Sequence, residues 1–149
     1  MEITGTSKKL ISIAKSKYGL QCVGNGVAAP GVIKKFILEF DCLYSIDQAG
    51  ARKLVIDYTE DCVVQLNAND KSKLHLENLP ANEKHIYFMI VFKDHNKKIC
   101  SELSAVILSN SKIMYSKYDP ITNNFCDYYE ENYHDAYLKV YTTIPPERY

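Results

Sequence analysis

Residues 32–67 read VIKKFILEFDCLYSIDQAGARKLVIDYTEDCVVQLN, and two different periods follow one another in this stretch. In residues 32–44 apolar and polar side chains alternate, a period of two that predicts a half-buried strand. In residues 47–67 apolar side chains recur every three or four positions, which predicts an amphipathic helix. Ser45 and Gln48 have the spacing of a capping box at the start of that helix. The stretch therefore predicts a strand joined to a long helix, with the helix packed on a sheet that contains the strand.

Two further segments precede this stretch. Residues 8–18 place Leu10, Ala14 and Tyr18 at helical spacing, and Gly19 is suited to end a helix in a left-handed turn. Residues 23–31, VGNGVAAPG, hold three glycines and a proline, which interrupt regular structure. We therefore expect a short helix followed by a loop.

After the long helix, the pattern changes to strands. Residues 85–92, 99–108 and 112–118 are rich in apolar and β-branched side chains, and short polar turns separate them at 94–97 and 110–111. Strands joined by such short links form an antiparallel meander. Asp119-Pro120 then breaks the strand pattern, and Asp127 with Glu130 offers a cap for a last helix.

The predicted element order is α-β-α-β-β-β-α in one α+β domain over residues 1–149, since a chain of 149 residues has the usual length of one domain. The simplest way to bury three amphipathic helices is a two-layer sandwich, with the helices on one face of a four-stranded, mainly antiparallel sheet. The sheet becomes mixed if the first strand pairs directly with the meander, because the connection through the long helix then joins parallel strands.

Composition predicts an ordinary folded protein, with 46% hydrophobic and 24% charged residues. Eighteen basic and eighteen acidic side chains cancel, which argues against a nucleic-acid partner because no strong positive field is available. The two ends differ, however: residues 1–35 carry a net charge of +5 and residues 119–149 a net charge of −4. Either both are solvated helix faces, or one is a basic edge that meets an acidic partner.

The apolar stretches of the chain are too short to span a bilayer, so we expect no integral membrane association. The chain as it stands predicts a cytoplasmic protein, and export with a leader that is absent here is the alternative. The five cysteines match neither a disulfide framework nor a CxxC site, which favours buried, reduced thiols over one or two long-range disulfides. They are Cys22, Cys42, Cys62, Cys100 and Cys126.

Three kinds of site have candidate residues in the sequence: a phosphate-binding loop, a cysteine–histidine pair and a metal site. Gly24-Asn25-Gly26 resembles a phosphate-binding loop in composition only, because a helix precedes it and a strand follows, the reverse of the phosphate-binding order. No histidine lies in a local signature around a cysteine, and the histidines occur beside acidic residues only as adjacent pairs, which rarely chelate together. We therefore predict no catalytic residue, no metal and no cofactor.

Twelve tyrosines are the most unusual feature of the composition. Several of them fall on one face of the predicted last helix, where they either pack on the sheet or form an exposed surface for a protein partner. These tyrosines are Tyr129, Tyr133, Tyr137 and Tyr141.

Several short runs together resemble a group of small uncharacterised proteins from intracellular bacteria, over residues 20–142. The runs are Ala51-Arg52-Lys53-Leu54-Val55, Ala68-Asn69-Asp70, Leu76-Glu77-Asn78-Leu79-Pro80, residues 86–92 with Lys93-Asp94, Lys112-Ile113, and Tyr118-Asp119-Pro120. The glycine-rich entry of that group is also similar to residues 24–31, although Asn25 and Ala28-Ala29 interrupt the glycines here. The resemblance implies no activity and no catalytic residue; members of the group often look exported.

The sequence as a whole predicts a noncatalytic protein-interaction module, an accessory or virulence-associated bacterial protein that binds a protein partner through a sheet edge or a tyrosine-bearing face. The oligomeric state is left open. The alternative is a small thiol-dependent hydrolase, or a ligand binder that uses the 24–31 loop. The predicted binding residues are Tyr129, Tyr133, Tyr137, Tyr141, Gly24, Asn25 and Gly26.

Overall fold

A computed structural model describes residues 2–28, 34–68 and 80–142. Three helices and one 3-10 turn accompany six strands in this part of the chain. In order, the elements are α1 (Glu2–Tyr18), β1 (Leu20–Ala28), β2 (Lys35–Cys42), α2 (Gln48–Ala68), η1 (Glu83–His85), β3 (Ile86–Phe92), β4 (Ala105–Ser109), β5 (Lys112–Asp119), β6 (Asn124–Asn132) and α4 (Tyr133–Tyr141).

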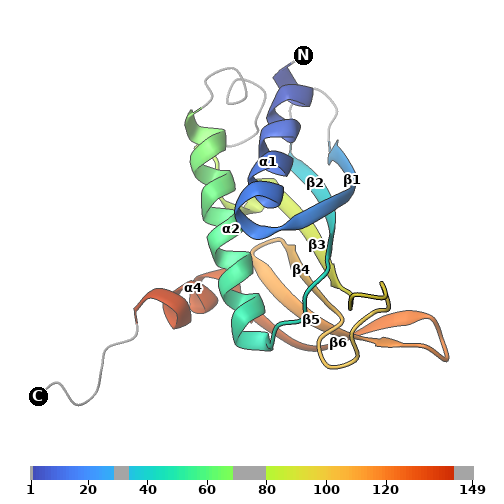
Figure 1. Cartoon of the computed structure of the whole chain (residues 1–149). Helices are drawn as coiled ribbons and strands as arrows, with labels where there is room; N and C mark the ends of the chain where they lie inside the picture. Colours follow the sequence, from blue (N-terminus) through green and yellow to red (C-terminus); the bar gives the residue numbers. More distant parts are fainter. Residues whose placement is uncertain (1, 29–33, 69–79, 143–149) are drawn as a thin grey trace, which may run out of the picture.

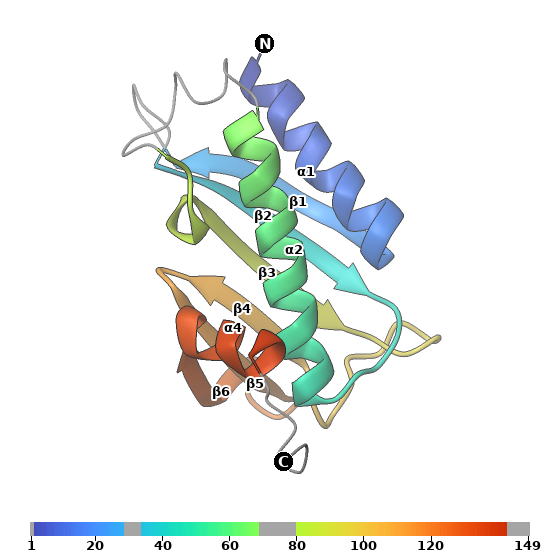
Figure 2. The ribbon, with the colours of Figure 1, turned by 90° about the vertical axis from the view of Figure 1, so that its left-hand side faces the viewer.

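The six strands form one open sheet in the order β1-β2-β3-β4-β5-β6. All neighbours are antiparallel except β2 and β3, which run parallel and are joined by the crossover through α2. Figures 1 and 2 show α1, α2 and α4 on the same face of the sheet, with β1 and β6 at opposite edges. The predicted α+β class is confirmed, and the sheet is the mixed variant of the mainly antiparallel sheet that was expected. The predicted four strands and the order α-β-α-β-β-β-α are wrong, because the observed order is α-β-β-α-β-β-β-β-α.

The first missing strand is β1, which includes residues 23–28 of the predicted loop; residues 29–31 lie outside the described residues. Gly24 and Gly26 pair with Glu39 and Ile37 of β2, and the register shifts between Cys22 and Gly24. Glycine disfavours a strand locally, but it is tolerated at an edge and beside a bulge. Pairing with β2 therefore overrides the turn signal of the glycines.

The second missing strand is β6, which the sequence assigned to the last helix. That helix begins at Tyr133, and its cap is Asn132 instead of Asp127. The Asn132 side chain accepts hydrogen bonds from the backbone N–H groups of His134 at 2.8 Å and of Asp135 at 3.4 Å. Residues 124–132 pair with β5 instead. Asn123 has a φ of 58°, a left-handed conformation that helps to close the β5–β6 turn.

Smaller differences concern the ends of elements. A strand was predicted at 99–108, whereas β4 is Ala105–Ser109, so it begins later and ends one residue later than predicted. The cap of α2 is Asp47 and not Ser45, because its carboxylate accepts a hydrogen bond from the Gly50 N–H at 2.8 Å. The predicted left-handed end of α1 is confirmed at Gly19, where φ is 66°. The predicted turn at 110–111 is also confirmed, with positive φ at both residues.

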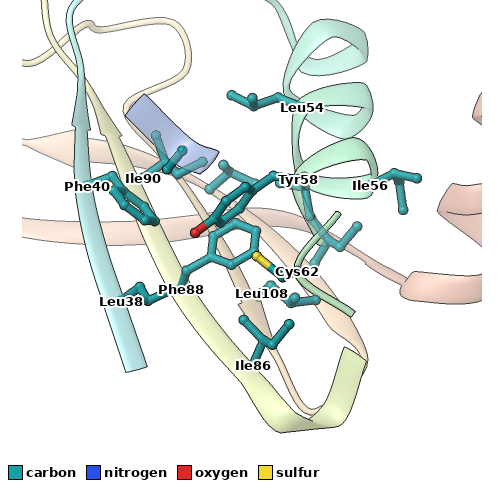
Figure 3. Packing of buried hydrophobic residues seen from close by; sticks show 14 of the residues in the cluster. Leu38, Phe40, Leu54, Ile56, Tyr58, Cys62, Ile86, Phe88, Ile90 and Leu108 are labelled. Atoms are coloured by element: carbon teal, nitrogen blue, oxygen red, sulfur yellow. The ribbon is translucent and has the colours of Figure 1, made fainter. Parts of the chain in front are cut away.

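The core lies between the helices and the sheet (Figure 3). At its centre the ring of Tyr58 meets the edges of Phe40 and Phe88, with ring centroids 5.6 and 5.2 Å apart. The Tyr58 hydroxyl donates a hydrogen bond to the backbone carbonyl of Leu10 at 2.9 Å, so the buried phenol is satisfied. One aromatic residue of α2 thus joins α1 to the two central parallel strands.

Candidate functional site

The candidate site is the edge of the sheet formed by β6, the nine residues 124–132, which we call the β6 edge. This strand pairs with β5 on one side, and no strand of the described chain lies on its other side. Seven of its nine residues are exposed, among them Tyr128 and Tyr129. The edge also carries three carboxylates, from Asp127, Glu130 and Glu131.

Glu131 is the one buried residue of the β6 edge. Its carboxylate accepts hydrogen bonds from the Tyr115 hydroxyl at 2.5 Å, the Arg52 guanidinium at 2.8 Å and the Lys139 ammonium at 2.9 Å. Burial opposes ionisation of this carboxyl, but the three donors outweigh burial and lower its pKa. Glu131 is therefore a charge-compensated junction that ties α2, β5 and α4 to the β6 edge.

A hollow of about 460 Å³ opens beside this junction, between the β6 edge and α4. Glu130 is more than half exposed and makes only a long ion pair with Lys112, at 3.5 Å. Three carboxylates and two ammonium groups thus border an open, polar depression. Its lining residues are Lys112, Tyr129, Glu130, Glu131, Asn132, Asp135 and Lys139.

The tyrosine rings of the β6 edge lie against cations of the same chain. The Lys117 ammonium is 5.2 Å from the centroid of the Tyr128 ring, and the Lys139 ammonium is 5.8 Å from that of Tyr129. A positive charge within about 6 Å of a ring face is attracted by the ring quadrupole. Both rings are therefore already in contact with a lysine of this chain.

The structure separates the four predicted tyrosines. Tyr129 belongs to β6, whereas Tyr133, Tyr137 and Tyr141 belong to α4 and face α2 or one another. The buried Tyr133 donates a hydrogen bond to Glu60 at 2.8 Å, and the exposed Tyr141 donates one to Asp57. The ring centroids of Tyr137 and Tyr141 are 5.3 Å apart. The α4 tyrosines thus hold α4 on α2, and only Tyr129 lines the hollow.

The acidic partners of these phenols were missed by sequence reasoning. Asp57, Glu60 and Asp61 lie on one turn of α2, and each accepts a hydrogen bond from a tyrosine of a neighbouring helix. The Asp61 carboxylate accepts hydrogen bonds from the Tyr18 hydroxyl of α1 at 2.5 Å and from the Lys17 ammonium at 2.9 Å. Burial opposes ionisation of Asp61, but these donors prevail and its pKa is lowered. The signal was the i, i+3, i+4 spacing of the three carboxylates.

The other predicted binding residues, Gly24, Asn25 and Gly26, lie in β1, at the edge of the sheet opposite β6. The two predicted sets are therefore not brought together (Figure 2). A second hollow, of about 550 Å³, lies near the start of α2. Its lining residues are Ser45, Ile46, Asp47, Asp94, Lys98, Ile99, Cys100, Ser101, Glu102 and Leu103.

Three of the five thiols differ from the activated thiol of a nucleophilic site. Burial raises the pKa of Cys62 to about 12, and it also raises the pKa of Cys42 and of Cys100. None of the described residues that line the hollow at Cys100 is a histidine. In residues 2–28, 34–68 and 80–142, no three histidine, cysteine or acidic side chains are grouped so that they could hold a metal ion.

No family model, curated protein or solved structure matches this chain. The resemblance to the small proteins of intracellular bacteria therefore stays a prediction. Among the described helices, none combines the length and the apolar character needed to cross a membrane.

Proposed function

We propose that this chain is a noncatalytic protein-interaction module that binds an extended, basic segment of a partner protein along the β6 edge. The observation that supports this most is the character of β6 itself. It is a nine-residue strand at the end of the described sheet, largely exposed, with three carboxylates and two exposed tyrosines.

Strand addition would supply the affinity. An edge strand directs half of its backbone N–H and C=O groups away from its only neighbour, and an extended peptide satisfies them by adding one more strand. Side-chain contacts on alternating positions then supply the specificity. A segment of about nine residues would match the length of β6.

Charge selects the class of partner. Residues 119–142 contain five acidic side chains and one lysine, and Lys112 and Lys117 of β5 also border β6. Five acidic side chains against three lysines leave a net charge of −2, a small negative excess that favours a positive segment over an acidic one. Within the hollow, a lysine or arginine of the partner would meet the carboxylates of Glu130 and Asp135. Further along the strand, Tyr128 offers an apolar ring that is 44% exposed.

A nuclear magnetic resonance titration tests this proposal. The probe is a synthetic peptide that alternates valine with lysine and has the length of β6; the control peptide carries glutamate in place of lysine. We expect the amides of β6 to shift with the basic peptide and not with the acidic one. Shifts confined to other elements, or equal shifts with both peptides, would contradict the proposal.

Two matched charge reversals sharpen the test. Glu130→Lys acts on the β6 edge, whereas Glu39→Lys makes the same change of charge at an exposed position of β2. Rim charges contribute modestly, so we expect Glu130→Lys to weaken binding of the basic peptide about three- to tenfold. Glu39→Lys should leave that affinity unchanged, and equal effects of the two would point to bulk charge instead of a site.

A further inference from the structure

The opposite edge of the sheet, β1, has a different character. Its nine residues, LQCVGNGVA, include no charged side chain. It pairs with β2 on one side, and the described part of the chain places no strand on the other. Val23 is 59% exposed there. Folded proteins guard an open edge with charges, proline or a bulge; β1 has no charge and no proline, and its bulge between Cys22 and Gly24 leaves residues 24–28 unguarded.

Beyond its bulge, β1 has regular strand geometry. Residues 24–28 pair with β2 in unbroken register after the shift between Cys22 and Gly24. Glycine in a strand permits close approach by another backbone, and this segment holds Gly24 and Gly26. Since no described strand lies on its outer side, the segment 24–28 is a template for one more strand.

We propose that a second copy of this chain occupies this edge, with the two β1 strands paired antiparallel across a twofold axis. The two sheets would then join into one continuous sheet. In a twofold interface the same patch meets itself, so like charges in the patch oppose one another. The neutral β1 meets its own copy without that cost, whereas two β6 strands would bring the exposed carboxylates of Asp127 and Glu130 from both copies together.

The twofold arrangement is also the one that closes with two copies. Pairing of β1 with β6 of another copy is a head-to-tail contact, which forms a ring where the rotation closes and an open filament where it does not. Pairing of β1 with β1 uses that edge once and leaves both β6 edges at the outer ends. The dimer is therefore compatible with the binding proposed for β6 and does not depend on it.

The lysines of helix α1 should make formation of the dimer depend on salt concentration. It packs on β1 and carries the exposed lysines Lys8, Lys9 and Lys15. The dimer gathers these like charges from two copies, so salt should strengthen it by screening their repulsion. Binding of a basic segment to the acidic β6 edge should respond in the opposite direction. This difference of sign separates the two proposals.

Sedimentation velocity over a wide range of protein concentration tests the dimer. We expect the full chain to pass from monomer to a limiting dimer, at lower concentration in higher salt. Val23→Lys should shift the midpoint to at least tenfold higher concentration, because edge lysines block strand pairing. Val64→Lys is the matched control, since Val64 is 67% exposed on α2, away from the edge; it should leave the midpoint unchanged.

A second variant and a second measurement guard against misfolding of the first. Asn25→Lys places the charge beyond the bulge and should act like Val23→Lys, with an unchanged circular dichroism spectrum. Amide hydrogen exchange at high concentration should slow in β1 and not in β6. The proposal is wrong if the chain stays monomeric, if Val64→Lys disrupts the dimer equally, or if the species grow beyond a dimer.

Discussion

The two edges of the sheet are built in opposite ways. The β1 edge is neutral, contains glycine and lies beside the lysine-bearing α1, whereas the β6 edge is acidic, carries tyrosine and lies beside α4 (Figure 2). Both strands leave one side of their backbone open in the described structure. Because both edges present the same unpaired backbone N–H and C=O groups, the side chains decide which strand binds to each edge.

The largest expected effect is a loss of stability of the whole fold, which affects both edges. Tyr58→Ala deletes the ring that joins α1 to β2 and β3, and we expect it to lower the free energy of unfolding by about 3–5 kcal/mol. Tyr58→Phe keeps the ring and loses only the hydrogen bond to Leu10, for which about 1 kcal/mol is expected. Urea unfolding measures both. Equal losses for the two variants would show that the ring packing contributes little.

The next effect should destabilise the β6 edge and leave the β1 edge unchanged. Glu131→Gln removes the charge that Arg52 and Lys139 share. We expect a loss of about 1–3 kcal/mol, because the buried Tyr115 hydroxyl and the largely buried Arg52 lose their anionic partner. Amide exchange should rise in β6 and α4 and stay unchanged in β1. Glu130→Gln, at the exposed neighbour, should change neither. Uniform loss of protection across the sheet would refute a local junction.

Acid should act in the same direction as Glu131→Gln. The folded-state pKa values of Glu131 and Asp61 are lowered, so the unfolded chain binds more protons in the range between folded and unfolded values. This stability is therefore fully present above the ordinary carboxyl pKa of about 4 to 4.5, and it is lost as the pH falls below that value towards the lowered folded-state pKa values. Urea unfolding at a series of pH values should show this fall. Glu131→Gln should make the fall shallower; an unchanged slope would contradict the role of that carboxylate.

The smallest effects concern the phenols that hold α4. Tyr133→Phe removes the hydrogen bond to Glu60, and we expect a loss of about 1 kcal/mol, since that phenol is buried. Tyr141→Phe removes the contact with Asp57 at an exposed position, and a smaller loss is expected. Thermal unfolding compares the two variants. A larger effect of Tyr141→Phe would reverse this order and indicate that the outer contact dominates.

The inner strands were predictable from sequence because their signals are local. The alternation in residues 32–44 predicts one buried face, and Phe36, Leu38 and Phe40 of β2 are buried. The helical period in residues 47–67 predicts one buried stripe, and Tyr58 of α2 is buried. The turn at residues 110–111 followed from its polar composition. In each case the residues themselves carry the period or the turn chemistry.

Both edge strands were missed because they become strands only through pairing with their neighbours β2 and β5. The glycines of β1 favour a turn until β2 is available as a partner, and the tyrosines of β6 fit a helical period as well as they fit a strand. The candidate site inherited these errors: Tyr129 was assigned to a helix, and Glu131 was not recognised as a junction because Arg52, Tyr115 and Lys139 come from three separate elements. Such contacts leave no local pattern in the sequence.

Amide hydrogen exchange of the full chain tests the central claim most directly, with protein concentration and the basic valine–lysine peptide varied independently. We predict that raising the protein concentration slows exchange in β1 alone, and that adding the peptide slows it in β6 alone. Protection of the same strand under both conditions, or of neither strand under either, would contradict the assignment of different partners to the two edges.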